Sequence, residues 1–291
     1  MRFATAETTD LPAERASVLF DGALSEPRLA HPEGVAVGPD GAVWCGTETG
    51  GIMRLAADGS GIEAIATTGG FALGIAFDGR GGLFVCDLKH ACVFRLDLDS
   101  RALEAHRAEG MRIPNYPVVD GRRGVLYVSD SHAFDTPGPG IWRMDLATGR
   151  WDLWFPHDLV FANGMALSRD GNSLFVIETF ARRISRVPIG PDGAADAPVP
   201  VAQDLPGLPD GLAVTDADEL IVGCYEPSRL LRIAADGSVT VHIEDVTAHT
   251  LCHPTNLALD GSTLYTANLG RWHVTRIETT VSAPRLWPAA S

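Results

Sequence analysis

The sequence predicts an all-β protein, a six-bladed β-propeller with four antiparallel strands in each blade. The main observation is a pattern that occurs six times: a turn, a short apolar strand, an Asp/Gly-type turn and a second apolar strand. Successive copies begin 40 to 48 residues apart, which is the spacing of one four-stranded blade. A second observation is a third strand in which an Arg alternates with apolar neighbours, as in Val93-Phe94-Arg95-Leu96.

The first copy shows how the residues make one blade. Residues 34–37 form the innermost strand, a Gly-Pro-Asp-Gly turn follows, and residues 42–45 form the second strand. Residues 52–55 form the third strand, and the Asp58-Gly59 turn leads into the fourth strand at residues 62–65. The six copies open at Glu33-Gly34, Leu73-Gly74, Asn115-Tyr116, Asn163-Gly164, Asp210-Gly211 and Thr255-Asn256.

The two ends of the chain are expected to meet in the last blade. The sixth copy ends near Glu278 with only three strands, whereas a strand-like run, Ala16–Phe20, precedes the first copy. We predict that this run is the outer strand of the last blade, which closes the ring and removes an open seam. The Pro/Ala/Gly-rich stretch Gly190–Pro200 predicts a surface loop in blade four, and residues 1–291 are expected to form one domain.

The composition limits the partners and the compartment. With 37 acidic and 23 basic residues the net charge is −14, which argues against nucleic acid and anionic membrane as partners. No apolar run is long enough to span a membrane, and the first residues resemble no hydrophobic signal segment, so we expect a cytoplasmic location. The five cysteines form no Cys-x-x-Cys pair and are expected to be core residues in a reducing compartment.

One position of the repeat predicts a metal site. It lies just before the innermost strand, where strands of different blades converge on the central channel, and it is occupied by Glu33, Leu73, Asn115, Asn163, Asp210 and Thr255. Glu33, Asn163 and Asp210 offer two carboxylates and an amide oxygen, which suit Ca²⁺, Mg²⁺ or Mn²⁺. Asn-Gly and Asp-Gly are also ordinary turn dipeptides. Because Leu73 holds the same position, however, the turn does not require a polar residue there.

These motifs resemble the SMP-30/gluconolactonase/LRE family. The resemblance spans the chain, and the segments that carry it are His31-Pro32-Glu33-Gly34, Phe161-Ala162-Asn163-Gly164, Leu208-Pro209-Asp210-Gly211 and Cys224-Tyr225. It implies a lactone hydrolase with one divalent cation on Glu33, Asn163 and Asp210. Ca²⁺ is the first choice, and Mn²⁺, Mg²⁺ and Zn²⁺ are the alternatives. The catalytic base is expected to be Asp210, with Glu33 as the alternative.

The resemblance and one loop also suggest residues that bind substrate. The family's Arg-x-Asn-Asp segment corresponds to Arg112-Ile113-Pro114-Asn115-Tyr116, which implies substrate contacts from Asn115 and, one residue further away than in the family, from Arg112. His132 opens a longer loop after a second strand, and this loop could cap the channel. Blade four also resembles strictosidine-synthase-like propellers.

The predicted function is a divalent-metal-dependent hydrolase that opens a small-molecule lactone or related ester with an activated water. The alternatives are an NHL-type binding or scaffold propeller with a structural metal, a phosphotriesterase, and a strictosidine-synthase-like enzyme. Condensation is disfavoured because blade six offers Thr255, Asn256 and Asn268 where that enzyme has a catalytic glutamate. The sequence has no Gly-x-Ser-x-Gly elbow and no nucleotide-binding glycine pattern. It does not predict the oligomeric state.

Overall fold

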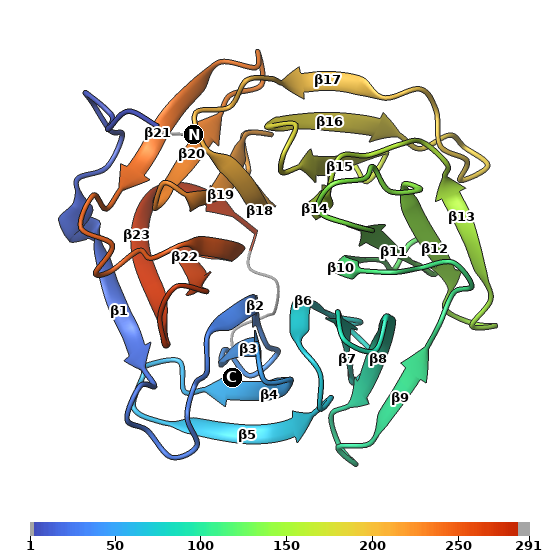
Figure 1. Cartoon of the computed structure of the whole chain (residues 1–291), viewed down its shortest axis with the longest axis horizontal. Coiled ribbons are helices and arrows are strands. Elements are labelled where there is room, and N and C mark those ends of the chain that lie inside the picture. The colour runs from blue at the N-terminus through green and yellow to red at the C-terminus, as the bar shows by residue number, and fades with distance from the viewer. Residues whose placement is uncertain (1–2, 285–291) are drawn as a thin grey trace.

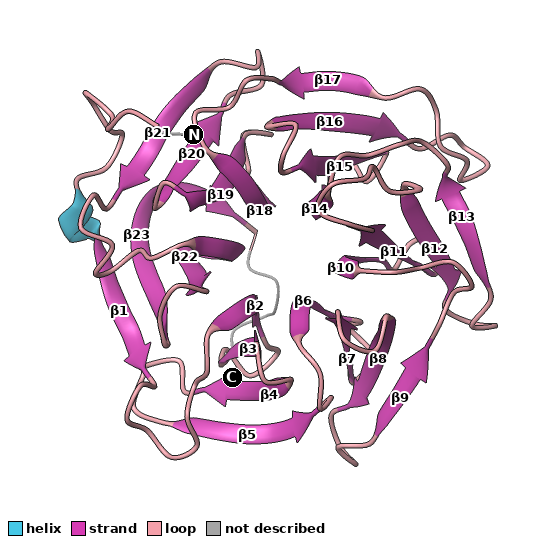
Figure 2. Cartoon of the chain, in the orientation of Figure 1, coloured by secondary structure: helices cyan, strands magenta, loops and turns pink. Residues whose placement is uncertain are grey.

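Six β-sheets surround a central channel in the computed structural model, which describes residues 3–284 (Figure 1). Five sheets have four strands in sequence order from the channel outward, and the sixth is completed by the N-terminal strand. The predicted six-bladed propeller is therefore confirmed. Figure 2 shows that strands make up nearly all of the regular structure, the exception being one short 3₁₀ helix, η1 (Ala13–Arg15).

The strands occupy four positions in each blade. The inner strands are β2 (Pro32–Val37), β6 (Ala72–Phe77), β10 (Pro114–Asp120), β14 (Ala162–Leu167), β18 (Leu208–Val214) and the first part of β22 (Pro254–Asn268). The second strands are β3 (Val43–Thr47), β7 (Gly82–Asp87), β11 (Val125–Asp130), β15 (Ser173–Glu178), β19 (Leu220–Glu226) and the remainder of β22. The third strands are β4 (Gly51–Leu55), β8 (Cys92–Asp97), β12 (Ile141–Asp145), β16 (Arg183–Pro188), β20 (Arg229–Ile233) and β23 (His273–Ala283). The outer strands are β5 (Ile62–Thr67), β9 (Leu103–His106), β13 (Trp151–Phe155), β17 (Val199–Ala202), β21 (Val239–Glu244) and β1 (Ala16–Asp21).

The N-terminal strand closes the ring as predicted. β1 pairs antiparallel with β23, with Ala16 opposite Ile277 and Asp21 opposite His273. The last blade does not end near Glu278, because β23 continues to Ala283. The extension is held by Asp216, whose backbone N–H donates to the Ser282 carbonyl and whose carboxylate accepts from the Ser282 hydroxyl.

The hydrophobic core is divided among the contacts between blades. Six clusters of buried side chains lie one between each pair of neighbouring blades. In the cluster that joins the first and last blades, Val35 and Val43 pack with Tyr265, and Phe20 of β1 packs against them. Burial of these side chains ties each blade to its two neighbours, so the ring positions the inner strands around the channel.

The structure also bears on the cysteines, on the predicted loop of blade four and on membrane-spanning segments. All five cysteines are buried and unpaired, as expected for core residues. Residues 190–198 lie between β16 and β17 in blade four, whereas Val199 and Pro200, which were expected in the loop, begin β17. Within residues 3–284, no helix has both the length and the apolar character that a membrane crossing requires.

Candidate metal centre

A β-bulge recurs at the start of the inner strands. In five blades, two residues of the inner strand stand opposite one residue of the second strand. The bulged pairs are Glu33-Gly34, Leu73-Gly74, Asn115-Tyr116, Asn163-Gly164 and Asp210-Gly211. The candidate residues therefore lie inside the strands, not just before them as the sequence suggested. A bulge redirects a side chain out of the regular pleat, and bulges are common beside active sites.

The glycines of these bulges let neighbouring blades approach closely. A Cβ atom on Gly164 would lie 2.4 Å from the Asp210 carbonyl oxygen, and one on Gly211 would lie 2.8 Å from the Thr255 carbonyl oxygen. Neither glycine has a positive φ. The Asn163-Gly164 and Asp210-Gly211 pairs lie inside β14 and β18 and are not tight turns, and their glycines provide room for the next inner strand.

The candidate ligands share buried oxygen atoms. Glu33, Asn115, Asn163 and Asp210 are all buried. In each of them one side-chain oxygen has no hydrogen-bond partner among residues 3–284: Glu33 Oε2, Asn115 Oδ1, Asn163 Oδ1 and Asp210 Oδ1. Unpaired buried oxygens are costly in a folded protein unless a ligand satisfies them. Leu73, at the same position in blade two, is buried and contributes no such atom.

The two carboxylates lie close enough to interact. Burial raises the pKa of Asp210 from an ordinary value of 3.8 to about 7. Burial, and then the nearby charge of Asp210, raise the pKa of Glu33 well above its ordinary value of 4.5. Neither carboxylate forms an ion pair with any basic side chain of the described chain. No basic neighbour would therefore neutralise the two carboxylates when they are ionised, and the protein alone favours their protonated forms.

This donor set fits a hard divalent cation. Two carboxylates and two amide groups present unpaired oxygens, and oxygen ligands of this kind suit Ca²⁺, Mg²⁺ or Mn²⁺. Over the described residues, no group of three or more His, Cys, Asp or Glu side chains could hold a metal ion. A cation at this position would therefore depend on amide oxygens as well as on the carboxylates.

Three hydroxyl residues for which no role was predicted orient the site. Asn115 Nδ2 donates to Ser131 Oγ (2.9 Å), and Asn163 Nδ2 donates to Thr179 Oγ1 (3.1 Å). In both blades the hydroxyl residue lies 16 positions after the asparagine and directly follows the second strand. The third, Thr255, donates to the Glu33 carbonyl (2.9 Å). The spacing of 16 residues from Asn115 to Ser131 and from Asn163 to Thr179 can be read from the sequence, and it is the signal that could have identified these two hydroxyl residues.

Two further polar side chains belong to this end of the channel. Tyr225 lies near the end of β19 at this mouth, and burial, followed by the charges of Glu33 and Asp210, raises its pKa. Asn256, which follows Thr255, is fully buried, and both polar atoms of its amide have no partner in the described chain. Neither residue was predicted to have a role in the site.

The predicted substrate-binding residues Arg112 and His132 contact each other. Arg112 Nη1 lies 3.3 Å from His132 Nε2, within hydrogen-bond distance. His31 and His253 also lie at this end, against Trp272 and Tyr225, with ring centroids 4.8 and 4.4 Å apart. His157, by contrast, packs on Phe155.

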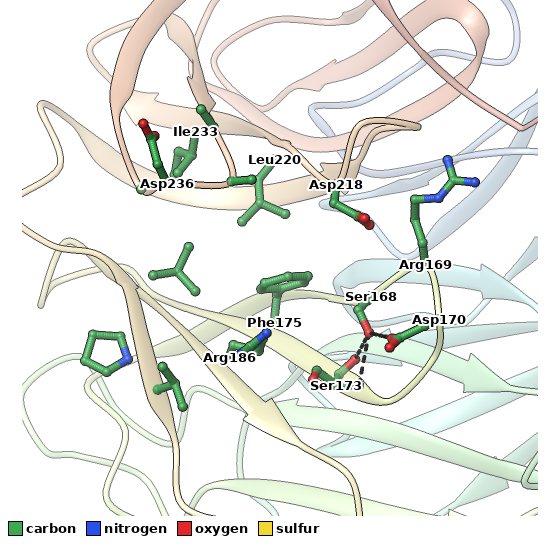
Figure 3. A pocket seen from close by; sticks show the side chains of 16 residues that line it. Ser168, Arg169, Asp170, Ser173, Phe175, Arg186, Asp218, Leu220, Ile233 and Asp236 are labelled. Atoms are coloured by element: carbon green, nitrogen blue, oxygen red, sulfur yellow. Dashed lines mark hydrogen bonds between the residues drawn. The ribbon is translucent and has the colours of Figure 1, made fainter.

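Two further cavities are lined by none of the candidate ligands. A cleft of about 750 Å³ between the fourth and fifth blades contains Asp170, Asp218 and Asp236 but none of the candidate ligands (Figure 3). A second cavity, of about 740 Å³, follows the inner strands from Val35 and Tyr116 toward the turns at the far end of the channel. The candidate ligands therefore occupy only one mouth of the channel.

Two protein families match parts of the chain, and together they cover most of it. Residues 74–268 match the family described as SMP-30/Gluconolactonase/LRE-like region, and residues 23–55 match strictosidine synthase-like, N-terminal. Strictosidine synthase-like 6 from Arabidopsis thaliana is 30% identical over 63% of this chain and 53% of that protein. Lactonase drp35 from Staphylococcus saprophyticus is 25% identical over 79% of this chain and 60% of that protein. The chain thus spans little more than half the length of these curated relatives.

Solved structures share the fold. A calcium-binding protein, regucalcin, from Agrobacterium tumefaciens superposes with a TM-score of 0.76 and 18% identity. The superposition covers 98% of this chain and 99% of that one. At this identity the likeness shows a common propeller architecture.

Proposed function

The chain belongs to the SMP-30/gluconolactonase/LRE-like family, and on that premise we propose that it is a divalent-metal-dependent hydrolase that opens a lactone or a related ester. The observation that carries the proposal is the pair of buried carboxylates, Glu33 and Asp210, beside two amides with unpaired oxygens. A lactonase among the curated relatives supports the reaction. A calcium-binding protein among the similar structures supports Ca²⁺ as the first candidate cation.

Glu33, Asn163 and Asp210 would hold the cation. When bound, it supplies Lewis-acid polarisation of the ester carbonyl and favours the charged form of the carboxylates. Asn163 is oriented for this role because its amide nitrogen is engaged by Thr179, which leaves the carbonyl oxygen free. Thr179 in turn donates to the Pro209 carbonyl (2.8 Å), next to Asp210.

The protein's own residues would move the proton and position the reactants. Asp210, or alternatively Glu33, accepts a proton from the attacking water as the water oxygen bonds to the carbonyl carbon. The ring C–O bond then breaks, and the proton passes to the leaving alkoxide, so the product is a hydroxy acid. Asn115 donates its amide hydrogen to Ser131, so its free oxygen can only accept a hydrogen bond from the water or from a substrate hydroxyl.

Acid release from a panel of lactones tests the proposal. The protein is stripped with a chelator and then supplied with Ca²⁺, Mn²⁺, Mg²⁺ or Zn²⁺. We expect turnover to disappear on stripping and to return with at least one cation. Asp210→Asn should lower the restored kcat by about a hundredfold or more. Glu104→Gln, an exposed carboxylate change on the outer strand β9, is the matched control and should retain full turnover.

Two results would count against the proposal. Full turnover by the stripped protein, or by Asp210→Asn, would show that the carboxylate pair and its cation are not the catalytic centre. If the folded protein releases no acid from any lactone with any cation, the proposed lactonase activity is excluded, and phosphotriesters become the next substrates to test.

A further inference from the structure

Three phenylalanine rings from three different loops lie against one another beside the candidate metal centre. Phe134 follows β11, Phe161 precedes β14 and Phe180 follows β15. The ring centroids are 5.1 Å apart for Phe134 and Phe161, 4.8 Å for Phe161 and Phe180, and 6.3 Å for Phe134 and Phe180. Phe134 is 69% exposed and Phe180 is 43% exposed. These three residues, called here the Phe cluster, are therefore packed on one another while their rings remain accessible.

The Phe cluster is continuous with the residues of the site. Phe161 stands two residues before Asn163. Phe180 directly follows Thr179, whose hydroxyl accepts from Asn163. Phe134 stands three residues after Ser131, whose hydroxyl accepts from Asn115.

The exposed aromatic residues of the described chain are concentrated at this end of the ring. Its large hydrophobic side chains with high exposure include four aromatic ones, Phe134, Phe180, Tyr225 and Trp272. All four lie where second strands end and inner strands begin, which is the end that carries Glu33, Asn163 and Asp210.

The backbone holds one of these rings in an uncommon conformation. Phe161 has a φ of 57°, in the left-handed region that bulky residues rarely adopt. The Phe161 carbonyl accepts a hydrogen bond from the Thr179 N–H (3.2 Å), which ties this loop to the end of β15. Such outliers persist only where the surrounding structure supports them, and they are frequent at ligand sites.

Two buried hydroxyl groups close in sequence to the Phe cluster, those of Ser131 and Thr179, are already engaged. Ser131 donates its hydroxyl hydrogen to the Ala162 carbonyl (2.6 Å), and Thr179 donates its own to the Pro209 carbonyl. Each of these hydroxyls also accepts a hydrogen bond from an asparagine of the site. A polyhydroxylated sugar ring placed against the Phe cluster would find no donor hydrogen on these two groups, whereas an apolar ring needs none.

We infer that the substrate is a lactone or ester with an aryl ring close to the scissile bond, and that the Phe cluster binds this ring while the carbonyl lies at Glu33, Asn163 and Asp210. The inference rests on the proposed hydrolase function for the position of the carbonyl. The three ring pairs are tilted, with interplanar angles of 31°, 43° and 48°, and aromatic rings away from a face-to-face sandwich interact favourably.

A matched pair of substrates tests the inference. The two lactones are γ-butyrolactone and its γ-phenyl derivative, and a sugar lactone is the third substrate. We expect the phenyl group to raise kcat/KM by about tenfold or more, and the sugar lactone to be the poorest of the three. The double variant Phe134→Ala/Phe180→Ala should lose that advantage and retain turnover of γ-butyrolactone. Val199→Ala removes an exposed apolar side chain from the outer strand β17 of the same blade as Phe180, and it should leave all three rates unchanged.

Binding of the corresponding lactams separates this inference from the proposed function. Calorimetry compares the phenyl-substituted γ-lactam with the unsubstituted one, neither of which needs to be hydrolysed. If the phenyl lactam binds about tenfold tighter in the natural protein but not in the double variant, the Phe cluster is an aryl-binding site even where no lactone is opened, and only the proposed hydrolase function fails. If the phenyl group brings no gain in affinity, or if the double variant keeps the gain, the inference is wrong, whatever the catalytic activity.

Discussion

Asp210 and Glu33 are two buried carboxyl groups that lie close together, an arrangement that is unfavourable in a folded protein. Both are buried, and their charges lie near one another without a basic partner in the described chain. In the metal-free protein both carboxyls take up protons on folding, because the pKa of each is raised. A cation bound between them would reverse this preference and stabilise the charged forms.

This chemistry predicts how stability depends on pH. For Asp210 the stabilising contribution of the protonated carboxyl is complete below 3.8 and is lost as the pH rises through about 7. The metal-free protein should therefore melt at lower temperature at pH 8 than at pH 6, and added Ca²⁺ should raise the melting temperature more at pH 8. Differential scanning calorimetry measures both effects. The double variant Glu33→Gln/Asp210→Asn should show neither, and equal Ca²⁺ stabilisation at both pH values would contradict the interpretation.

Thr179 predicts a second effect at the level of single residues. Its hydroxyl accepts a hydrogen bond from Asn163 and donates one to the Pro209 carbonyl. Thr179→Val should therefore remove the hydrogen bond that orients the Asn163 side-chain amide. Groups that orient metal ligands typically contribute about 10- to 100-fold in affinity, and we expect a loss of that size in Ca²⁺ binding by calorimetry. Thr240→Val, on the exposed face of β21, is the control and should bind normally. If Thr179→Val binds as tightly as the natural protein, the hydroxyl does not orient a ligand.

At the scale of elements, the repeated bulge explains which parts of the site could be predicted. The blade period places Glu33, Asn163 and Asp210 in one register, so the sequence predicted that they meet although they lie far apart in the chain. It could not predict the bulge, because Asn-Gly and Asp-Gly occur equally in turns. The Phe cluster was also not predictable, since it depends on three loops whose conformations no periodic pattern determines.

The bulge glycines make this description testable. In Gly211→Ala the new Cβ would lie 2.7 Å from the Asn256 Cα atom, and backbone atoms cannot move away easily. We expect the free energy of unfolding to fall by about 1–3 kcal/mol, with weaker Ca²⁺ binding because Asp210 is displaced. Gly61→Ala is the control, since a Cβ there meets nothing within 4 Å and Gly61 has no positive φ. Equal stability of the two variants in urea would show that close approach at Gly211 is not required.

The ring as a unit depends on closure by the N-terminal segment. β1 pairs with β23, and ahead of it the backbone N–H groups of Asp10 and Leu11 donate to Val241 and His242 of blade five. The same segment therefore joins the last two blades. The sequence predicted the first contact from the missing fourth strand, but nothing in the repeat predicted the second.

Removal of residues 1–21 should open the ring. We expect the melting temperature to fall by about 10 °C or more, because β23 loses its outer partner and the cluster around Val35 loses Phe20. A peptide of residues 10–21 added in excess should restore part of the loss. A truncated protein that melts at the same temperature as the full chain would show that closure is dispensable.

The position of the cation can be determined by anomalous X-ray diffraction from crystals grown with Mn²⁺. We expect one strong anomalous peak in the channel, bounded by the side-chain oxygens of Glu33, Asn163 and Asp210, and no peak there in crystals of Asp210→Asn. A peak at another place in the ring, or none at saturating Mn²⁺, would contradict the assignment of these three residues as a metal centre.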